Sequence, residues 1–220
     1  MEYITTEKDI ANNTDGKKET TERKYTETII PRVAKFEKVS FETFMEAFLP
    51  IFVQTKKAEL NIPAGESFGY DRQELEDKAR YTYDNIKLPT RSTAGSAGYD
   101  FYYPFGDTKL VPGAGITIPT GIKAYITPGW VLKEYPRSSL GFKYRLQFDN
   151  TVGIIDSDYY DNPENEGHIF VKLTNDSKTG KECIISTNMR MCQGIFVPYG
   201  ITLDDDADGV RTGGFGSTGA

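Results

Sequence analysis

The segment from Lys87 onward consists of short apolar runs separated by turn-forming residues, and this texture constrains the fold more than any other feature of the sequence. Successive turn signals stand about 8–12 residues apart, which is the spacing typical of sandwiches and barrels rather than of βαβ units. We therefore predict an all-β domain over residues 87–203. The expected strands lie at 117–118, 122–126, 130–132, 168–173, 183–185 and 195–197.

The two ends of the chain differ from this central region. Residues 1–28 are polar and bury too little apolar surface to offset the entropy of ordering, so we expect a loose tail. Residues 29–86 form a partly helical extension of unassigned role, with a helix capped by Ser40 and broken or kinked at Pro50, and a second helix from Asp71 to Arg80. Residues 204–220 are acidic and then glycine-rich, which predicts a flexible arm.

Composition excludes several classes of function. The formal net charge of -6 argues against a general binder of nucleic acid, because such proteins present a clustered basic surface. The sequence has no run of 18 apolar residues and no visible secretory signal. Cys183 and Cys192 are too few for a disulfide framework, and the lone His168 rules out a histidine-rich metal site. We expect a soluble cytoplasmic protein, or one in the host cytoplasm if the source is viral, without nucleic-acid or membrane partners.

Five segments in one order carry a resemblance to a known family. The segments are Ala97-Gly98-Tyr99-Asp100-Phe101, Pro136-Arg137-Ser138-Ser139-Leu140-Gly141, Asn150-Thr151-Val152-Gly153-Ile154-Ile155-Asp156-Ser157-Asp158-Tyr159, Met191-Cys192-Gln193-Gly194-Ile195-Phe196 and Arg211-Thr212-Gly213-Gly214-Phe215-Gly216-Ser217-Thr218-Gly219. Taken together, they identify residues 87–219 as similar to the homotrimeric deoxyuridine triphosphatase (dUTPase) family. The resemblance implies a jelly-roll-like β-clip fold, a homotrimer with shared active sites, and Mg²⁺-dependent hydrolysis of dUTP to dUMP and pyrophosphate.

The third segment supplies the candidate catalytic residue. Asp156 ends an apolar run, and a carboxylate at the end of a buried strand can orient and deprotonate a water. On an extended chain Asp156 and Asp158 face one way and Tyr159 the other. Two aspartates in an exposed turn are the ordinary interpretation of such a pattern, but the other segments favour Asp156 as the base, with Asp158 structural. The resemblance places Tyr159 against the deoxyribose, where a ring leaves no room for a 2′-hydroxyl.

The same segment also carries the base-binding candidates. An Asn side chain offers one donor group and one acceptor, and the resemblance matches Asn150 to the hairpin that binds uracil, together with Gly153. Without that context, Asn150 is interpreted as a turn residue that follows Asp149.

Phosphate-binding candidates come from two other segments. The planar guanidinium of Arg137 suits phosphate oxygens, and Ser138 offers a short donor. Ser138 lacks the G-x-S-x-G context of a serine nucleophile. By resemblance, Ser139 and Gly141 belong to the same phosphate-binding segment, and Gln193 faces the phosphates rather than being a solvated strand amide.

The resemblance assigns Asp100 to the metal region, through water. Mg²⁺ keeps several waters and is carried on phosphates rather than in an all-protein cage, so no dense carboxylate cluster is needed. The acidic run from Asp204 to Asp208 lacks the spacing of a calcium loop and is interpreted as a solvated loop.

The C-terminal arm combines glycines with one arginine and one phenylalanine, which argues against a simple linker. By resemblance the arm closes over a site on another subunit, where Arg211 meets the γ-phosphate and Phe215 stacks on uracil. Backbone N–H groups around Gly216 and the hydroxyls of Ser217 and Thr218 add donors to the phosphates.

Three departures from the family pattern stand out. Only Thr212 separates Arg211 from Gly213, where the family usually has two residues, and the loop 160–166 replaces a short turn. Residues 1–86 have no counterpart in the minimal enzyme, and they are candidates to dock on the trimer or to bind a protein partner. The sequence thus predicts a dUTP diphosphatase. The alternatives are a dCTP deaminase of the same superfamily, or a regulatory binding protein that uses the same fold.

Overall fold

The computed structural model describes residues 3–12, 18–27, 30–63 and 65–214. The chain divides into two compact units, residues 1–32 and residues 33–220. The larger unit contains the β domain together with the helices that precede it in the sequence. Its boundary therefore lies near Val33, well before the start of the β pattern at Lys87.

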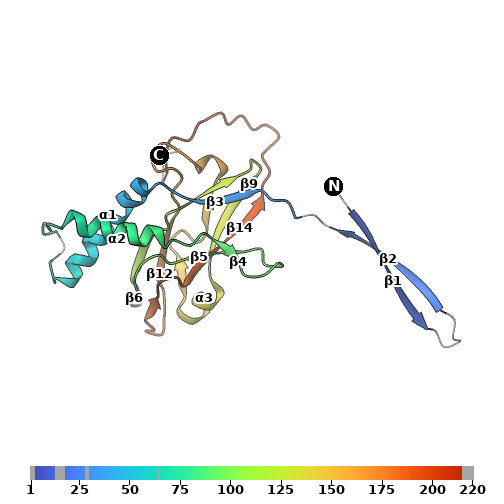
Figure 1. The fold of residues 1–220 in the computed structure, drawn as a ribbon, viewed down its shortest axis with the longest axis horizontal. Coiled ribbons are helices and arrows are strands. Elements are labelled where there is room, and N and C mark those ends of the chain that lie inside the picture. The colour runs from blue at the N-terminus through green and yellow to red at the C-terminus, as the bar shows by residue number, and fades with distance from the viewer. Residues whose placement is uncertain (1–2, 13–17, 28–29, 64, 215–220) are drawn as a thin grey trace. The chain divides into compact units, whose positions relative to one another are not determined.

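The β domain is built from antiparallel strand pairs, as the turn spacing predicts (Figure 1). One sheet has the order β11-β9-β14-β5-β4, a second has the order β10-β12-β7, and the pairs β13-β6 and β3-β8 complete the described part of the domain. The strands are β3 (Ala34–Lys38), β4 (Thr90–Arg91), β5 (Tyr99–Tyr102), β6 (Thr108–Leu110), β7 (Gly115–Pro119), β8 (Ile122–Ile126), β9 (Trp130–Pro136), β10 (Leu146–Phe148), β11 (Gly153–Ile155), β12 (Phe170–Asn175), β13 (Cys183–Ile185) and β14 (Arg190–Pro198).

The described strands confirm the all-β prediction for this region. Each of the expected strands coincides with an observed one, and their alternation puts residues such as Val171 and Leu173 of β12 into the core. In the larger unit, the strands β3, β4, β5, β6 and β10 were not among those expected, and β11 was expected only as the apolar run that Asp156 ends. They are short or carry polar residues, so their apolar pattern is weak.

Helix α1 (Phe41–Glu59) begins where the sequence predicts, because the Ser40 side chain accepts a hydrogen bond from the backbone N–H of Thr43 at 3.1 Å. Of the two predicted effects of Pro50, the break is wrong, since the helix continues through this residue to Glu59, and the kink stays a prediction. Pro50 removes one backbone donor, but the helix buries Phe44, Phe48 and Phe52 against the core. This burial stabilises the helix more than the lost hydrogen bond weakens it.

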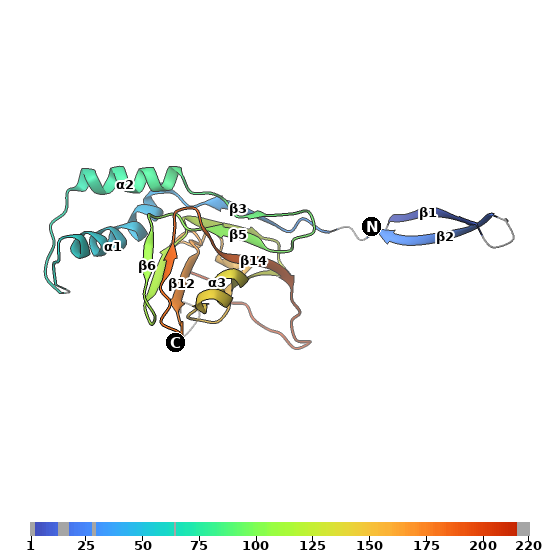
Figure 2. The same ribbon diagram turned by 90° about the horizontal axis from the view of Figure 1, so that it is seen from below.

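Helix α2 (Arg72–Asp84) lies beside α1 at one side of the β domain (Figures 1 and 2). Asp71 caps it, as the prediction of a helix from Asp71 requires, and Leu75 and Ala79 are buried. Strand β3 pairs with β8 from Ala34 to Lys38. The extension is therefore part of the hydrophobic core of the β domain.

Gly121 shows how closely the extension approaches the β domain. Its φ is +72°, and a Cβ atom here would lie 2.3 Å from Ile86 Cδ1 and 3.2 Å from Phe44 Cδ2. A side chain at this position would force Ile86 to move, would crowd Phe44, and would strain a backbone that favours glycine. The backbone N–H of Gly121 donates a hydrogen bond of 2.8 Å to His168 Nε2.

Residues 1–28, predicted to be a loose tail, contain two strands in the structure, β1 (Tyr3–Asn12) and β2 (Lys18–Glu27). They form an antiparallel two-stranded sheet in which Tyr3 pairs with Glu27 and Asn12 with Lys18. Alternating threonines and charged residues suit a two-stranded ribbon, but an isolated hairpin is only marginally stable in water. The expectation of a loose tail here stays a prediction.

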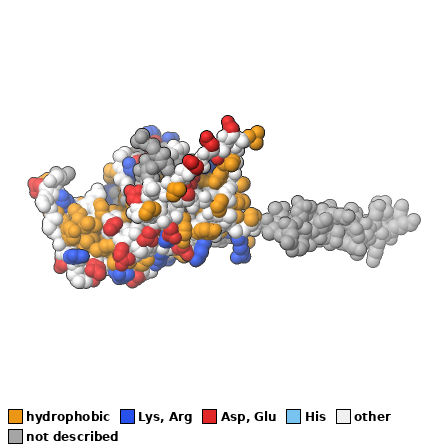
Figure 3. Space-filling model, turned by 90° about the horizontal axis from the view of Figure 1, so that it is seen from above, with side chains coloured by type: hydrophobic (Ala, Val, Ile, Leu, Met, Phe, Trp, Pro, Cys, Tyr) orange, Lys and Arg blue, Asp and Glu red, His pale blue; other side chains and the backbone are white. Residues whose placement is uncertain are grey.

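The chain leaves β14 as a segment without helix or strand over residues 199–214 and returns across the β domain. We call residues 204–214 the described part of the arm. On the face shown in Figure 3, charged side chains of both signs intermix with exposed hydrophobic ones. Among the described helices, none has the length and apolar character needed to cross a membrane.

Candidate active site

A tight turn from β10 to β11 forms one wall of the candidate site. It corresponds to the predicted hairpin and keeps that name below, although β10 and β11 belong to different sheets. The backbone N–H of Thr151 donates to the Phe148 carbonyl at 3.1 Å, and that of Val152 donates to the Asn150 carbonyl at 2.7 Å. Thr151 has φ +68°, a conformation that β-branched residues rarely adopt. Such strain persists where the surrounding structure fixes the backbone, often at functional sites. The turn leaves Asn150 exposed at its tip.

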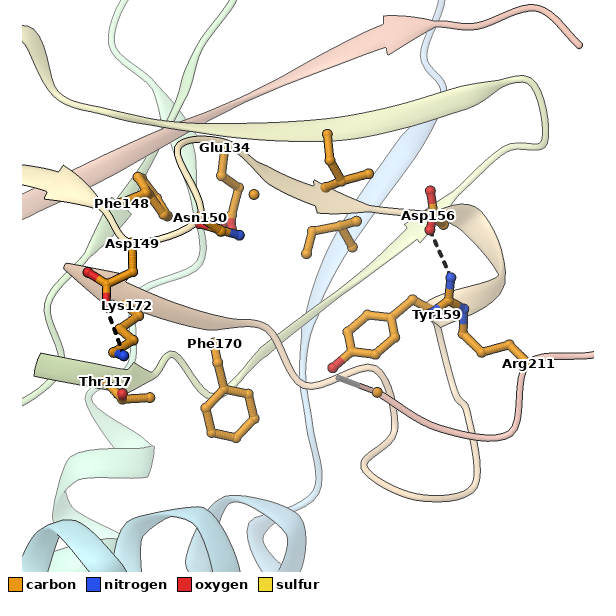
Figure 4. Close-up of a pocket in the computed structure, with 14 residues that line it drawn as sticks. Thr117, Glu134, Phe148, Asp149, Asn150, Asp156, Tyr159, Phe170, Lys172 and Arg211 are labelled. Carbon is orange, nitrogen blue, oxygen red and sulfur yellow. Dashed lines mark hydrogen bonds and ion pairs between the residues drawn. The ribbon is translucent and has the colours of Figure 1, made fainter. Parts of the chain in front are cut away.

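Next to this hairpin lies a pocket of about 350 Å³, a volume within the range of small-molecule sites (Figure 4). It brings together the hairpin, the end of β11, strand β12 and the arm. Of the residues predicted from sequence, it contains Asn150, Gly153, Asp156, Tyr159 and Arg211. Its other lining residues are Thr117, Glu134, Phe148, Asp149, Ile154, Ile155, Phe170, Lys172 and Gly214.

Asp156 follows the last residue of β11, and its side chain is 49% exposed. Arg211 of the arm holds this carboxylate through a 2.8 Å contact from Nη2 to Oδ2, and its Nε donates to Asp158 Oδ1 at 2.9 Å. The carboxylate therefore lies at the mouth of the pocket, where it can accept a proton, and its charge is balanced by a residue of the arm (Figure 4).

The predicted orientation of Tyr159, on the opposite face from Asp156, is wrong. Strand β11 ends at Ile155, and after the extended Asp156 the residues Ser157–Tyr159 form the 3-10 helix η1, so the strand alternation does not reach Tyr159. Asp156 and Tyr159 consequently line the same pocket instead of facing opposite sides. The Tyr159 hydroxyl donates to the His168 carbonyl at 2.8 Å, and burial raises its pKa. Tyr160 does point away, with its hydroxyl on Glu37 of β3.

The loop 160–166, a departure from the family pattern, joins three parts of the molecule. Asn165 Nδ2 donates to the Tyr159 hydroxyl at 2.9 Å, and Glu164 Oε2 accepts from the backbone N–H of Gly214 in the arm at 2.6 Å. Glu166 accepts from the backbone N–H of Ser40 at 2.9 Å and from the Thr43 hydroxyl at 2.7 Å. One loop thus contacts the pocket, the arm and the start of α1.

Arg137 and Ser138 lie in a second pocket, at the start of α3 (Ser138–Tyr144), together with Gly141. Ser138 and Ser139 are both exposed, although Ser139 does not line the pocket. The two pockets share no lining residue. A single chain therefore keeps the predicted phosphate-binding residues of this segment apart from Asn150 and Asp156.

Asp100 is buried at 3% exposure and faces positive charge. Arg137 contacts Oδ1, while Ser92 at 3.0 Å and Arg190 at 3.4 Å contact Oδ2. Burial alone would raise the pKa of Asp100, but the hydrogen bonds from Arg137 and Ser92 hold it below its usual value. Gln193 lies opposite Asp100 in the β5–β14 register.

This arrangement bears on the expected magnesium site. Within the part of the chain that the structure describes, no group of three or more His, Cys, Asp or Glu residues could hold a metal ion. Both oxygens of Asp100 already accept hydrogen bonds. The residues present therefore fit only a Mg²⁺ carried by phosphates that reaches Asp100 through water.

The remaining candidates, Phe215, Gly216, Ser217 and Thr218, lie outside the described residues. In the described part of the arm, Arg211 and Gly214 contact the pocket of their own chain. Closure over another subunit, which the resemblance implies, stays a prediction.

Sequence reasoning missed Glu134 and Lys172, which line the first pocket from β9 and β12. Lys172 of β12 forms an ion pair of 2.8 Å with Asp149, which lies in the turn after β10. Glu134 follows the fully buried Leu132 by two residues, so strand alternation from Leu132 would have placed it inward. The predicted strand ended at Leu132, whereas β9 continues to Pro136, so the alternation was not followed as far as Glu134.

Comparisons with known proteins give the following similarities. Residues 84–219 match the family model described as dUTPase. The chain is 45% identical over 143 residues to the deoxyuridine 5'-triphosphate nucleotidohydrolase of Lactococcus lactis, covering 64% of this chain and 93% of that protein. It is 37% identical over 139 residues to the protein of the same name from Chromobacterium violaceum, covering 60% and 87%. The crystal structure of the Streptococcus mutans dUTPase aligns with a TM-score of 0.47 and 41% identity, covering 54% of this chain and 90% of that one.

Proposed function

The chain belongs to the dUTPase family and is a dUTP diphosphatase, and from this premise we propose how its residues divide the work. The observation that carries the proposal is the first pocket, which joins the Asn150 hairpin, Tyr159, Asp156 and the arm residue Arg211 in one cavity. Its volume and the charged side chains among its lining residues suit a nucleoside whose phosphates extend toward Asp156.

Uracil occupies the part of the pocket beside the hairpin. The exposed amide of Asn150 and the backbone around Gly153 supply donors and acceptors for the base. The ring of Tyr159 is fixed by its hydrogen bonds to His168 and Asn165, so it can exclude a 2′-hydroxyl by shape. A rigid ring discriminates better than a deformable apolar wall.

Asp156 acts as the general base. Its carboxylate orients a water for attack on the α-phosphorus and accepts the proton, and pyrophosphate leaves. In the chain without substrate, Arg211 neutralises Asp156. Transfer of Arg211 to the triphosphate would free the carboxylate at the moment the substrate is in place, since the guanidinium binds phosphate as well as carboxylate.

The phosphates also need Arg137, Ser138 and Gln193, which do not line this pocket. We propose that a homotrimer brings the second pocket of one copy to the first pocket of another. Mg²⁺, when bound with the triphosphate, neutralises charge on the phosphate oxygens. Asp100 contributes through water, and its ion pair with Arg137 holds that guanidinium in position.

The experiment that tests this proposal is pyrophosphate release from dUTP, UTP, dTTP and dCTP with Mg²⁺. We expect activity on dUTP alone. Analysis of the nucleotide products covers the alternative, since conversion of dCTP to dUTP would contradict the assignment. Asp156→Asn should lower kcat by at least about 10²-fold, the low end for losing a positioned base, while dUTP still binds. Near-normal turnover in this variant would remove Asp156 from the mechanism.

A further inference from the structure

Glu134 lies in β9 between two glycines of the neighbouring strands. Its backbone pairs with Gly153 of β11 on one side and with Gly194 of β14 on the other. The side chain is 1% exposed and lines the first pocket, into which it points from β9 (Figure 4). A Cβ atom on Gly153 would lie 2.8 Å from Glu134 Oε2, so the carboxyl group fills the space that the glycine leaves.

The carboxyl group lacks the partner that burial normally demands. Glu134 Oε1 has no hydrogen-bond partner among the described residues. A buried polar atom in this condition costs free energy of folding, and a well-packed apolar side chain would avoid that cost. Burial raises the pKa of Glu134 to about 8, so the group is largely uncharged at neutral pH.

The groups around Glu134 do not explain its presence. On β14 the nearby titratable side chain is Cys192, which is itself fully buried. On β11 the residue paired with Glu134 is Gly153, which has no side chain. The charged residues of the pocket are already paired with each other, Asp149 with Lys172 and Asp156 with Arg211. Glu134 is thus a hydrogen-bonding group that faces a ligand pocket and, among the described residues, has no partner for Oε1.

We propose that Glu134 is a base-recognition residue of the first pocket, and that its uncharged carboxyl group binds the imide edge of the pyrimidine. A protonated carboxyl offers one O–H donor and one carbonyl acceptor. The imide edge of uracil presents the matching pair, the N3–H and an adjacent carbonyl oxygen. This inference rests on the proposed function, because it assigns a contact within the nucleotide site named there.

The test is the affinity of the full-length protein for dUMP, measured by calorimetry. Glu134→Met removes both hydrogen-bonding atoms at similar volume and should weaken dUMP binding about tenfold, as expected for roughly one to two hydrogen bonds between uncharged groups. Glu134→Gln keeps a donor and an acceptor and should bind within a few fold of the wild type. Glu182→Gln, an exposed glutamate outside the pocket that pairs with Lys109, serves as the control.

A second ligand isolates the contact. The second ligand is dUMP with a methyl group on N3 in place of the hydrogen. This methyl group should reduce the affinity of the wild type and of Glu134→Gln more than that of Glu134→Met, because the Met side chain makes no hydrogen bond to N3–H that the methyl group could remove. Equal dUMP affinities in wild type and Glu134→Met, or the same methyl penalty in both, would overturn the proposal. The melting temperature of Glu134→Met should equal or exceed that of the wild type, since the variant removes an unpaired buried carboxyl.

The pH profile gives an independent readout. Above pH of about 8 the Glu134 carboxyl ionises and can no longer donate, so dUMP affinity of the wild type should fall more steeply than that of Glu134→Gln. Parallel profiles would contradict the inference. Pyrophosphate release by the wild type is measured separately: its absence would refute the proposed function, whereas activity with unaltered binding in Glu134→Met would refute only the role of Glu134.

Discussion

The two N-terminal regions that lie outside the family match differ in whether they belong to the folded β domain. Residues 1–32 form a unit of their own around the β1–β2 hairpin, whereas residues 33–83 are built into the core of the β domain. Both precede residue 84, where the match to the dUTPase model begins. Position outside a family pattern therefore says little about whether a segment belongs to the folded domain.

The distribution of apolar residues explains the difference. The extension carries phenylalanines at helical spacing, and Phe44, Phe48 and Phe52 all reach the core. The strands β1 and β2 consist largely of threonine and charged residues. Burying a large apolar side chain contributes about 1.5–3 kcal/mol, so the stripe on α1 suffices to join the extension to the domain.

Truncation should separate the two regions most sharply. A chain that begins at residue 84 should fail to fold, because it exposes the core surface that α1 covers. A chain that begins at residue 33 should fold and hydrolyse dUTP. Soluble yield, circular dichroism and pyrophosphate release measure both. A stable, active chain from residue 84 would show that the extension is dispensable.

Phe44→Ala should be the most damaging single change in the extension. Phe44 is fully buried against Tyr83, Phe48 and His168, and its removal leaves a cavity. We expect a loss of about 3–5 kcal/mol in unfolding free energy, measured by urea denaturation. Tyr81→Ala, on the exposed face of α2 at 73% exposure, should change it by less than about 0.5 kcal/mol.

Glu166→Ala tests the link between the extension and the site. It removes the acceptor for the Ser40 N–H and the Thr43 hydroxyl, and we expect a loss of about 1–2 kcal/mol in stability, as for a helix cap. Because the same loop holds Tyr159 through Asn165, kcat/KM for dUTP should fall as well. Glu76→Ala, at an exposed position of α2, should leave both the melting temperature and kcat/KM unchanged.

Acid should weaken the junction of the extension with the β domain. Burial lowers the pKa of His168 to about 4. The stability that the neutral His168 contributes to the folded state is therefore fully present above pH 6.5 and is lost as pH falls toward 4. Hydrogen bonds from Ser40 and Thr43 outweigh desolvation and lower the pKa of Glu166 to about 2, so its contribution disappears between 4.5 and 2. Burial raises the pKa of Glu134 to about 8, so its contribution to stability has the opposite pH dependence: it is fully present below pH 4.5 and is lost as pH rises toward 8.

We therefore expect the stability to rise as pH falls from 8 to about 6.5, where Glu134 titrates without opposition from the other two groups, and to change little from 6.5 to about 4.5, where Glu134 and His168 oppose each other. Below about 4.5 the stability should fall steeply, and urea midpoints measure the whole profile. In His168→Gln the midpoint should rise, relative to that of the wild type, as pH falls from 6.5 toward 4. Parallel curves for the two proteins would mean that His168 does not contribute.

The smallest effect concerns the hairpin. Limited proteolysis within residues 1–32 should leave dUTP hydrolysis and the melting temperature unchanged, since the hairpin forms a sheet of its own. Activity of the nicked protein, against an uncut sample, measures this. Loss of activity on cleavage would show that the hairpin takes part in the site, and resistance to protease would show that it is held in place.

The sequence by itself determined the elements whose signals are local. Turn spacing predicted the β domain, Ser40 and Asp71 marked the starts of both helices, and the ordered segments placed Asn150, Gly153, Asp156 and Arg211 among the site candidates. Such signals depend on neighbours along the chain, so a single sequence carries them.

Tertiary structure alone decided the contacts between distant segments. The continuation of α1 past Pro50 depends on the core beneath it, and the shared pocket of Asp156 and Tyr159 depends on the turn into η1. Glu166 reaches Ser40 across 126 positions of sequence, and Arg211 reaches Asp156 across 55. Burial and pairing of this kind arise only when strands and helices pack, because the free energy of each contact depends on partners that no local pattern names.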